Sequence, residues 1–180
     1  MAASTGQPPS LPYRPLGRFG HVSTIIEGRQ YMWHGSYGAL SGPPPSVVEV
    51  FEDVLPNWQQ KATSGQPPPE SVYAACTSIG IHIYVFGGLD TKTAYNTIHR
   101  LDTKRLVWRE LPTSNPSEAP MAKWCARMVS LTTNILVIVG GYGILPDHRH
   151  PNRQYTPYPV YEGMGWTNEL HCFHVVSSEL

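Results

Sequence analysis

The sequence is poor in charged residues, which make up 14% of the chain, and it contains no long uninterrupted run of apolar residues. Without such a run there is no candidate for a membrane-spanning helix, and a hydrophobic content of 41% indicates a soluble, globular chain. Thirteen basic residues balance thirteen acidic ones, so no overall electrostatic field favours binding to nucleic acid or to a membrane surface.

Cysteine is scarce. Cys76, Cys125 and Cys172 are an odd number, and no two of them form a C-x-x-C pair. Each lies in an apolar, strand-like stretch, so we expect three reduced cysteines in the core. The amino terminus lacks the basic and apolar regions of a signal peptide, and no Asn-x-Ser/Thr site has a permitted middle residue. These absences predict a cytoplasmic or nuclear location.

Motifs of several enzyme classes are also missing. There is no Walker lysine loop, no G-x-S-x-G elbow, no H-E-x-x-H and no pair of carboxylates at a credible spacing. His148 and His150 have the spacing of half a metal site, but no third ligand is near, and two polar residues of a loop are the simpler interpretation. We therefore expect no catalytic residue, no metal, no cofactor and no enzymatic activity.

A repeated strand pattern is present, and it is clearest between residues 73 and 108. An apolar run reaches Gly80, and a β-branched and aromatic stretch follows it at 81–86. Neither face of this second stretch is polar, which predicts a strand that is covered on both sides. Gly87-Gly88 ends this strand. A loop, a third strand and a turn lead to a fourth strand that carries Trp108. The strands are predicted at residues 73–79, 81–86, 96–101 and 106–111.

Imperfect copies flank this unit, and four short antiparallel strands in about 45 residues are typical of a propeller blade. Upstream, the spacing from Gly28 to Gly35 equals the spacing from Gly80 to Gly87. The spacing from Val48 to Trp58 likewise equals the spacing from Ile98 to Trp108. Downstream, Gly140-Gly141 is a further glycine doublet.

An apolar strand that ends in Gly-Gly, a variable loop, an aromatic or apolar third strand and then a Trp together resemble the kelch repeat. The resemblance implies an all-β fold, a partial kelch β-propeller of about three four-stranded antiparallel blades. The first unit has Gly35-Ser36 in place of Gly-Gly, which predicts a looser turn there. Residues 1–16 form a Pro/Gly-rich segment before a kelch propeller fragment at 17–180. The blades are expected at about 17–64, 70–114 and 121–180.

The third unit is incomplete, because ten residues after Leu170, where a Trp is expected, the chain reaches Leu180. We expect this blade to lack its last strand. Closed propellers usually have four to eight blades, so the pattern predicts either a fragment of a larger propeller or a chain that assembles with other copies.

Two groups of residues outside the repeat pattern are candidates for binding. Blade two concentrates basic residues on its third-to-fourth-strand hairpin, for which a solvated hairpin is the simpler interpretation. A long insertion in blade three, at 142–165, is rich in aromatic and basic residues, which interaction hot spots favour. The basic group consists of Arg100, Lys104, Arg105 and Arg109.

The insertion and its flanks carry a closer resemblance. The runs GGYGILP and GWTNELH look like parts of the third blade in one group of kelch proteins. This group consists of the substrate receptors of cullin-RING ubiquitin ligases that are similar to kelch domain-containing protein two. Those receptors bind the carboxyl terminus of a substrate in a deep pocket of a six-bladed propeller. The resemblance implies a pocket tyrosine at Tyr142, a pocket tryptophan at Trp166 and a pocket lysine at Lys123. For Trp166, packing within a strand is an alternative.

The resemblance predicts a peptide-binding protein whose partners are protein C-termini and, in a full-length form, components of a cullin ligase. A first alternative is a kelch scaffold that binds cytoskeletal or transcriptional partners through its loops. A second is a fragment of a copper radical oxidase, although the sequence reproduces no full set of that family's Tyr, Cys and His ligands.

Overall fold

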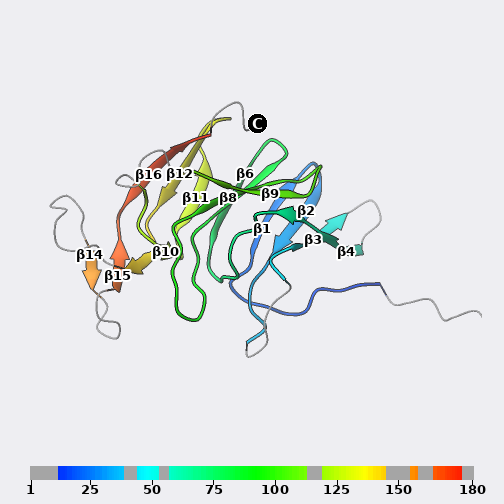
Figure 1. Cartoon of the computed structure of the whole chain (residues 1–180), viewed down its shortest axis with the longest axis horizontal. Coiled ribbons are helices and arrows are strands. Elements are labelled where there is room, and N and C mark those ends of the chain that lie inside the picture. Colours follow the sequence, from blue (N-terminus) through cyan, green and yellow to red (C-terminus); the bar gives the residue numbers. More distant parts are fainter. Residues whose placement is uncertain are drawn as a thin grey trace, which may run out of the picture.

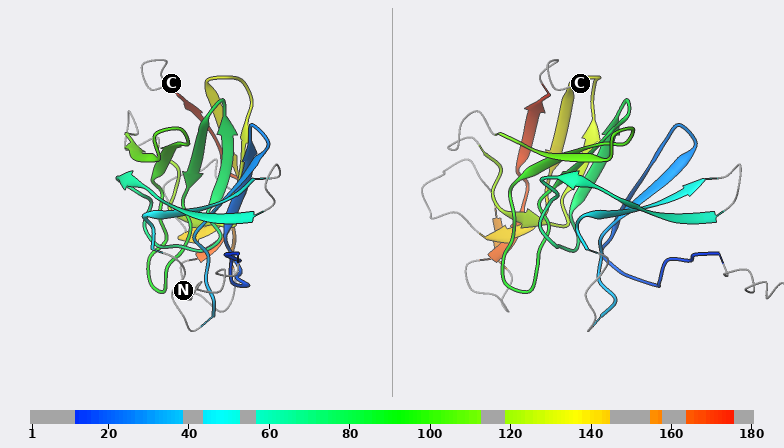
Figure 2. Two further views of the ribbon diagram at one scale, coloured as in Figure 1. Left: turned by 90° about the vertical axis from the view of Figure 1, so that its right-hand side faces the viewer. Right: turned by 45° about the vertical axis from the view of Figure 1, so that its right-hand side comes forward.

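Every regular element of the structure is a β-strand. In this computed structural model three sheets lie side by side in chain order (Figure 1), and blade two lies between blades one and three (Figure 2). The all-β prediction and the partial kelch propeller are thereby confirmed. The structure describes residues 12–38, 44–52, 57–112, 119–144, 155–157 and 164–175.

Blades one and two are antiparallel sheets whose strands pair in the order of the chain, apart from one added strand. Blade one consists of β1 (Val22–Ile26), β2 (Arg29–Trp33), β3 (Val47–Glu52) and β4 (Asn57–Ala62). Blade two consists of β6 (Ala75–Ile79), β7 (His82–Phe86), β8 (Ile98–Asp102) and β9 (Val107–Leu111), with the short β5 (Ser64–Gly65) paired in parallel to β9.

Blade three has three strands in the described part of the chain, and a small second sheet lies at one end of it (Figure 1). The blade consists of β11 (Arg127–Ser130), β12 (Ile135–Val139) and β16 (Leu170–His174). The small sheet pairs β10 (Lys123–Trp124), β13 (Tyr142–Ile144), β15 (Met164–Thr167) and β14 (Tyr155–Pro157), in that order. Residues 176–180, where the fourth strand of the blade was expected to be missing, lie outside the described residues.

The central strand β7 is buried on both faces, as its sequence predicted. Tyr84 and Phe86 belong to an apolar cluster shared with blade three, whereas Ile83 and Val85 belong to a cluster shared with blade one. All five residues of β7 are buried. Each blade therefore serves as the core of its neighbour, which is how stacked repeats gain stability.

The turn after β2 corrects one prediction. His34 and Gly35 have φ angles of 52° and 97°, close to the 67° and 99° of Gly87 and Gly88. His34-Gly35, and not Gly35-Ser36, therefore takes the place of the doublet, so the turn is the same and not looser. A left-handed histidine is unfavourable, and its ring Nδ1 hydrogen-bonds the backbone oxygen of Ser71 at 2.9 Å.

Two further predictions about burial were wrong in part. The three cysteines are free, but Cys125 and Cys172 are exposed and only Cys76 is half-buried. Cys172 faces outward because residues alternate along β16, and its face has no covering sheet in the described part of the chain. In the basic group of blade two, Lys104, Arg105 and Arg109 are exposed as predicted, whereas Arg100 lies on β8 with 6% of its surface exposed.

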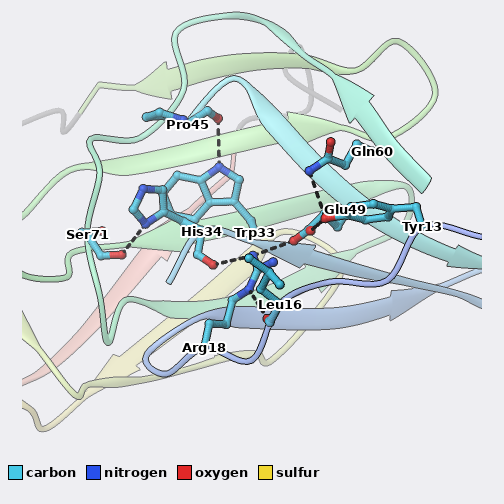
Figure 3. Close-up of polar contacts among 9 residues, drawn as sticks. All are labelled: Tyr13, Leu16, Arg18, Trp33, His34, Pro45, Glu49, Gln60 and Ser71. Carbon is cyan, nitrogen blue, oxygen red and sulfur yellow. Dashed lines mark hydrogen bonds and ion pairs between the residues drawn. The ribbon is translucent and has the colours of Figure 1, made fainter. Parts of the chain in front are cut away.

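The segment before β1 is fixed to blade one by a buried ion pair (Figure 3). Arg18 Nη1 lies 2.6 Å from Glu49 Oε2 and donates to the backbone oxygen of His34 at 3.0 Å, and both charged side chains are at most 2% exposed. Tyr13 donates its hydroxyl to the other oxygen of Glu49 and accepts a hydrogen bond from Gln60 at 2.9 Å. Both charged groups thus have partners within blade one, although Arg18 Nη2 is buried without a hydrogen-bond partner among the described residues, and the cluster holds this segment against the blade.

Candidate functional site

A cleft of about 480 Å³ opens between blade two and the small sheet. Blade two contributes the loop that follows Gly87-Gly88, and the small sheet contributes its aromatic face. Mostly apolar walls with a few polar groups are typical of ligand sites. The lining residues are Leu89, Thr91, Lys92, Trp124, Tyr142, Met164 and Trp166.

Three aromatic side chains form a ladder across the small sheet. In the strand register, Trp124 of β10 is opposite Tyr142 of β13, and Tyr142 is opposite Trp166 of β15. The rings meet edge to face, with centroids 4.9 Å apart at 63° for the first pair and 5.1 Å apart at 72° for the second. Such cross-strand aromatic pairs are favourable and hold the rings in fixed orientations.

Glycines allow the strands of the ladder to approach closely. Gly141 has a φ of 106° and ends the connection from β12 directly before Tyr142. A Cβ atom on Gly143 would lie 2.2 Å from the backbone oxygen of Ala122, so any other residue would push β10 away from β13. The glycines around Tyr142 therefore place Trp124 against its ring.

Lys123 lies on the opposite face of β10 from Trp124, because side chains alternate along a strand. It is fully buried, and its Nζ is 2.7 Å from Glu169 Oε2. The other oxygen of Glu169 is 2.8 Å from His171 Nε2, and the backbone NH of Met121 donates to Oε2 at 3.3 Å. Lys123 thus does not line the cleft and is instead part of an ion pair behind the ladder.

The charge of Glu169 is stabilised in place. Burial by itself raises the pKa of this carboxyl group, but the hydrogen bonds and positive charges of His171 and Lys123 outweigh it and lower the pKa to about 2. The Glu169 carboxylate therefore stays ionised at neutral pH, and its contact with Lys123 ties β10 to the start of β16.

The loop from blade two is also well ordered by its own hydrogen bonds. Asp90 Oδ1 accepts from the backbone NH groups of Lys92 and Thr93, both at 2.6 Å, and Oδ2 accepts from the Tyr95 hydroxyl at 2.7 Å. The hydrogen bond from Tyr95 lowers the pKa of Asp90, and the same bond raises the pKa of Tyr95 to about 12. This turn places Lys92 at the edge of the cleft.

The structure thus brings together Tyr142 and Trp166, two of the three residues that sequence analysis proposed, with Lys123 adjacent but behind them. Trp124 and Lys92 also line the cleft but were not predicted from the sequence. The strand that carries Trp124 has only two residues, and its pairing with Tyr142 is seen only in the structure. Most of the insertion, including His148 and His150, lies outside the described residues.

The described residues contain no group of three or more His, Cys, Asp or Glu side chains placed to hold a metal ion. They also include no helix with the length and apolar character that crossing a membrane would require.

The protein is a kelch-repeat β-propeller, which is a class of protein-interaction module. This class is defined here by the four-stranded sheets, by the glycine doublets that follow the second strand of a blade, and by a cleft formed by loops. The model of the KLHDC2/KLHL20/DRC7 kelch-repeats domain matches residues 6–179, and the chain therefore belongs to this family.

Several curated proteins are similar to the chain over part of their length. Kelch domain-containing protein 3 of Bos taurus is 30% identical over 64% of this chain and 30% of that protein. Rab9 effector protein with kelch motifs of Danio rerio is 29% identical over 57% of this chain and 28% of that protein. Dynein alpha chain, flagellar outer arm, of Chlamydomonas reinhardtii is 24% identical over 72% of this chain and 3% of that protein. The chain therefore matches less than a third of the length of each relative.

Proposed function

We propose that this chain binds an extended peptide terminus in the cleft, as the substrate-recognition part of a cullin-RING ubiquitin ligase receptor. The observation that carries the proposal is the edge-to-face ladder of Trp124, Tyr142 and Trp166 along one wall of an open cleft. Rigid aromatic side chains lose little conformational entropy on binding and offer a large contact area, as at interaction hot spots.

Each proposed residue has a distinct role. Trp166, with 49% of its surface exposed, provides the accessible wall, and the 6% exposed Tyr142 provides the back of the cleft. Lys123 lies behind that wall and holds β10 in place through its ion pair with Glu169. The peptide docks and leaves without any bond being made or broken, and the expected partners are protein C-termini together with ligase subunits in a longer form of the protein.

A second candidate is a scaffold for cytoskeletal or transcriptional partners in the cytoplasm or nucleus. It is favoured by the names of two relatives, a Rab9 effector and a flagellar dynein chain, which indicate functions other than ubiquitination. On this alternative the same exposed aromatics bind a folded partner and not a peptide terminus.

Peptide binding is tested with a fluorescein-labelled pool of random decapeptides that have free carboxyl termini, titrated with the 180-residue chain and followed by anisotropy. We expect the parent to bind and Trp166→Ala to lose at least tenfold in affinity. Trp58→Ala, which removes a tryptophan from β4 far from the cleft in sequence and outside its lining, is the matched control and should bind as the parent does.

Equal binding by Trp166→Ala and the parent would refute the pocket. The ligase assignment is tested separately by tagging the product of the full natural reading frame and identifying the proteins that co-purify with it. Cullin and RING subunits support the receptor, whereas cytoskeletal or transcriptional proteins without them would favour the scaffold.

A further inference from the structure

Among the described residues that line the cleft, Lys92 is the one charged side chain. The other six described residues are Leu89, Thr91, Met164 and the three aromatic residues of the ladder, and none of them carries a carboxylate. A positive charge beside an apolar wall is complementary to a ligand that carries an anionic group next to an apolar or small segment.

The position of Lys92 is fixed by its backbone, although its side chain is exposed. The loop closes through the bridge between Leu89 and Ala94, and the Asp90 carboxylate holds the NH groups of Lys92 and Thr93. The same carboxylate also accepts a hydrogen bond from the hydroxyl of Tyr95. Asp90 is therefore engaged by its own loop, and the Lys92 ammonium has no ion pair within the residues that the structure describes.

The contrast with Lys123 indicates which lysine can meet a ligand. Lys123 is fully buried, and its charge is neutralised by Glu169 at 2.7 Å. To reach a ligand, its ammonium would have to leave a buried ion pair and pass the aromatic ladder, which would leave the Glu169 carboxylate buried and uncompensated. Lys92 needs no such rearrangement.

We propose that Lys92 receives a carboxylate of the bound peptide while the adjoining residues of that peptide pack against Trp124, Tyr142 and Trp166. This inference rests on the proposed peptide-binding function and extends it, because it adds blade two to the site. The carboxylate can belong to the carboxyl terminus or to an acidic side chain, and the experiment separates these two sources.

The test uses three fluorescein-labelled decapeptide pools. The first has a free carboxyl terminus and no Asp or Glu, the second is amidated and has no Asp or Glu, and the third is amidated with one Asp or Glu. We expect the parent to bind the first or the third pool about twofold to fivefold more tightly than the second, the range for a partly solvated charge pair. Lys92→Gln should remove this preference, so that it binds the three pools alike.

Two further variants separate a specific contact from general charge. Lys92→Arg should keep most of the preference, and the exposed Lys104→Gln, on another hairpin of blade two, should keep all of it. If the parent binds a carboxylate pool preferentially and Lys92→Gln retains that preference, or if the three pools bind alike, the Lys92 inference fails while the peptide site stands. If the parent binds no pool, both proposals fail.

Discussion

Within the part of the chain that the structure describes, aromatic rings meet edge to face in two places, at the seam between blades one and two and in the cleft. At the seam, Trp33 and Trp108 have ring centroids 5.8 Å apart at 62°, and in the cleft Tyr142 and Trp166 are 5.1 Å apart at 72°. The geometry is similar, but the seam tryptophans are 3% and 1% exposed, whereas Trp166 is 49% exposed.

The difference comes from what covers the rings. Trp108 occupies the repeat position on β9, where the sheet of blade one covers it. Trp166 lies on β15, in a sheet separate from the three strands of blade three, and its outer side is open. Aromatic residues at repeat positions thus build the scaffold, whereas Trp166, in the small sheet next to the insertion, is available to a partner.

Replacement of Trp108 should give the largest loss of stability. We expect Trp108→Ala to lower the free energy of unfolding by about 3 to 5 kcal/mol, because a fully buried ring leaves a cavity that the two sheets cannot close. Trp166→Ala should cost less than about 1 kcal/mol, since half of its ring is already in water. Urea denaturation of both variants measures the difference, and equal losses would contradict the division between scaffold and cleft.

Gly87 links the scaffold to the cleft, and its replacement should have the next largest effect. Its φ is 67°, and an added Cβ would lie 2.4 Å from the backbone oxygen of Lys123. We expect Gly87→Ala to cost about 3 kcal/mol, from left-handed strain and from displacement of β10, and to weaken peptide binding as well.

Gly80 provides a matched control for the strain alone. Its φ is 55°, but no atom lies within 4 Å of an added Cβ. Gly80→Ala should therefore cost about 1 kcal/mol and leave peptide binding intact. If the two alanine variants unfold at the same denaturant concentration, the close approach to β10 has no energetic importance.

The ion pair behind the ladder should make the cleft sensitive to acid, with a smaller effect. Because the pKa of Glu169 is lowered from 4.5 to about 2 in the folded chain, its contribution is fully present above pH 4.5 and is lost as the pH falls towards 2. We expect this loss to be about 2 kcal/mol, measured by denaturation across that range.

Glu169→Gln identifies the carboxyl group responsible. The variant should be less stable than the parent by about 2 kcal/mol at neutral pH, and the gap should close as the pH approaches 2. A gap that stays constant from pH 7 to pH 2 would show that the charge of Glu169 is not what stabilises β10.

Much of the fold could be predicted because it depends on local patterns. The apolar alternation of β7 and the place of Trp108 on a fourth strand both follow from short-range sequence. The doublet of blade one was misaligned by one residue, because counting glycines cannot detect a histidine held at positive φ. His34 is held in this conformation by a contact distant in sequence, because its ring Nδ1–H donates a hydrogen bond to the backbone oxygen of Ser71, 37 residues further along the chain.

The cleft was predicted less completely, because its walls come from distant segments. Resemblance drew attention to Tyr142 and Trp166, which lie on adjacent strands. Trp124 belongs to a strand of two residues that no periodicity can reveal, and Lys92 belongs to a loop of another blade. Neither the burial of Lys123 nor its pairing with Glu169, 46 residues away, has a local signal in the sequence.

The added strand β5 has a consequence for self-association. An unpaired outer strand offers its backbone to other chains, and this is a common route to aggregation. In blade two, Ser64 and Gly65 pair with Val107 and Trp108, so the linker from blade one occupies part of the outer edge of β9. A Cβ on Gly65 would lie 2.2 Å from the Trp108 oxygen, so a glycine is required for this protection. The parallel pairing of β5 thus leaves less of the β9 backbone open to a strand of another chain.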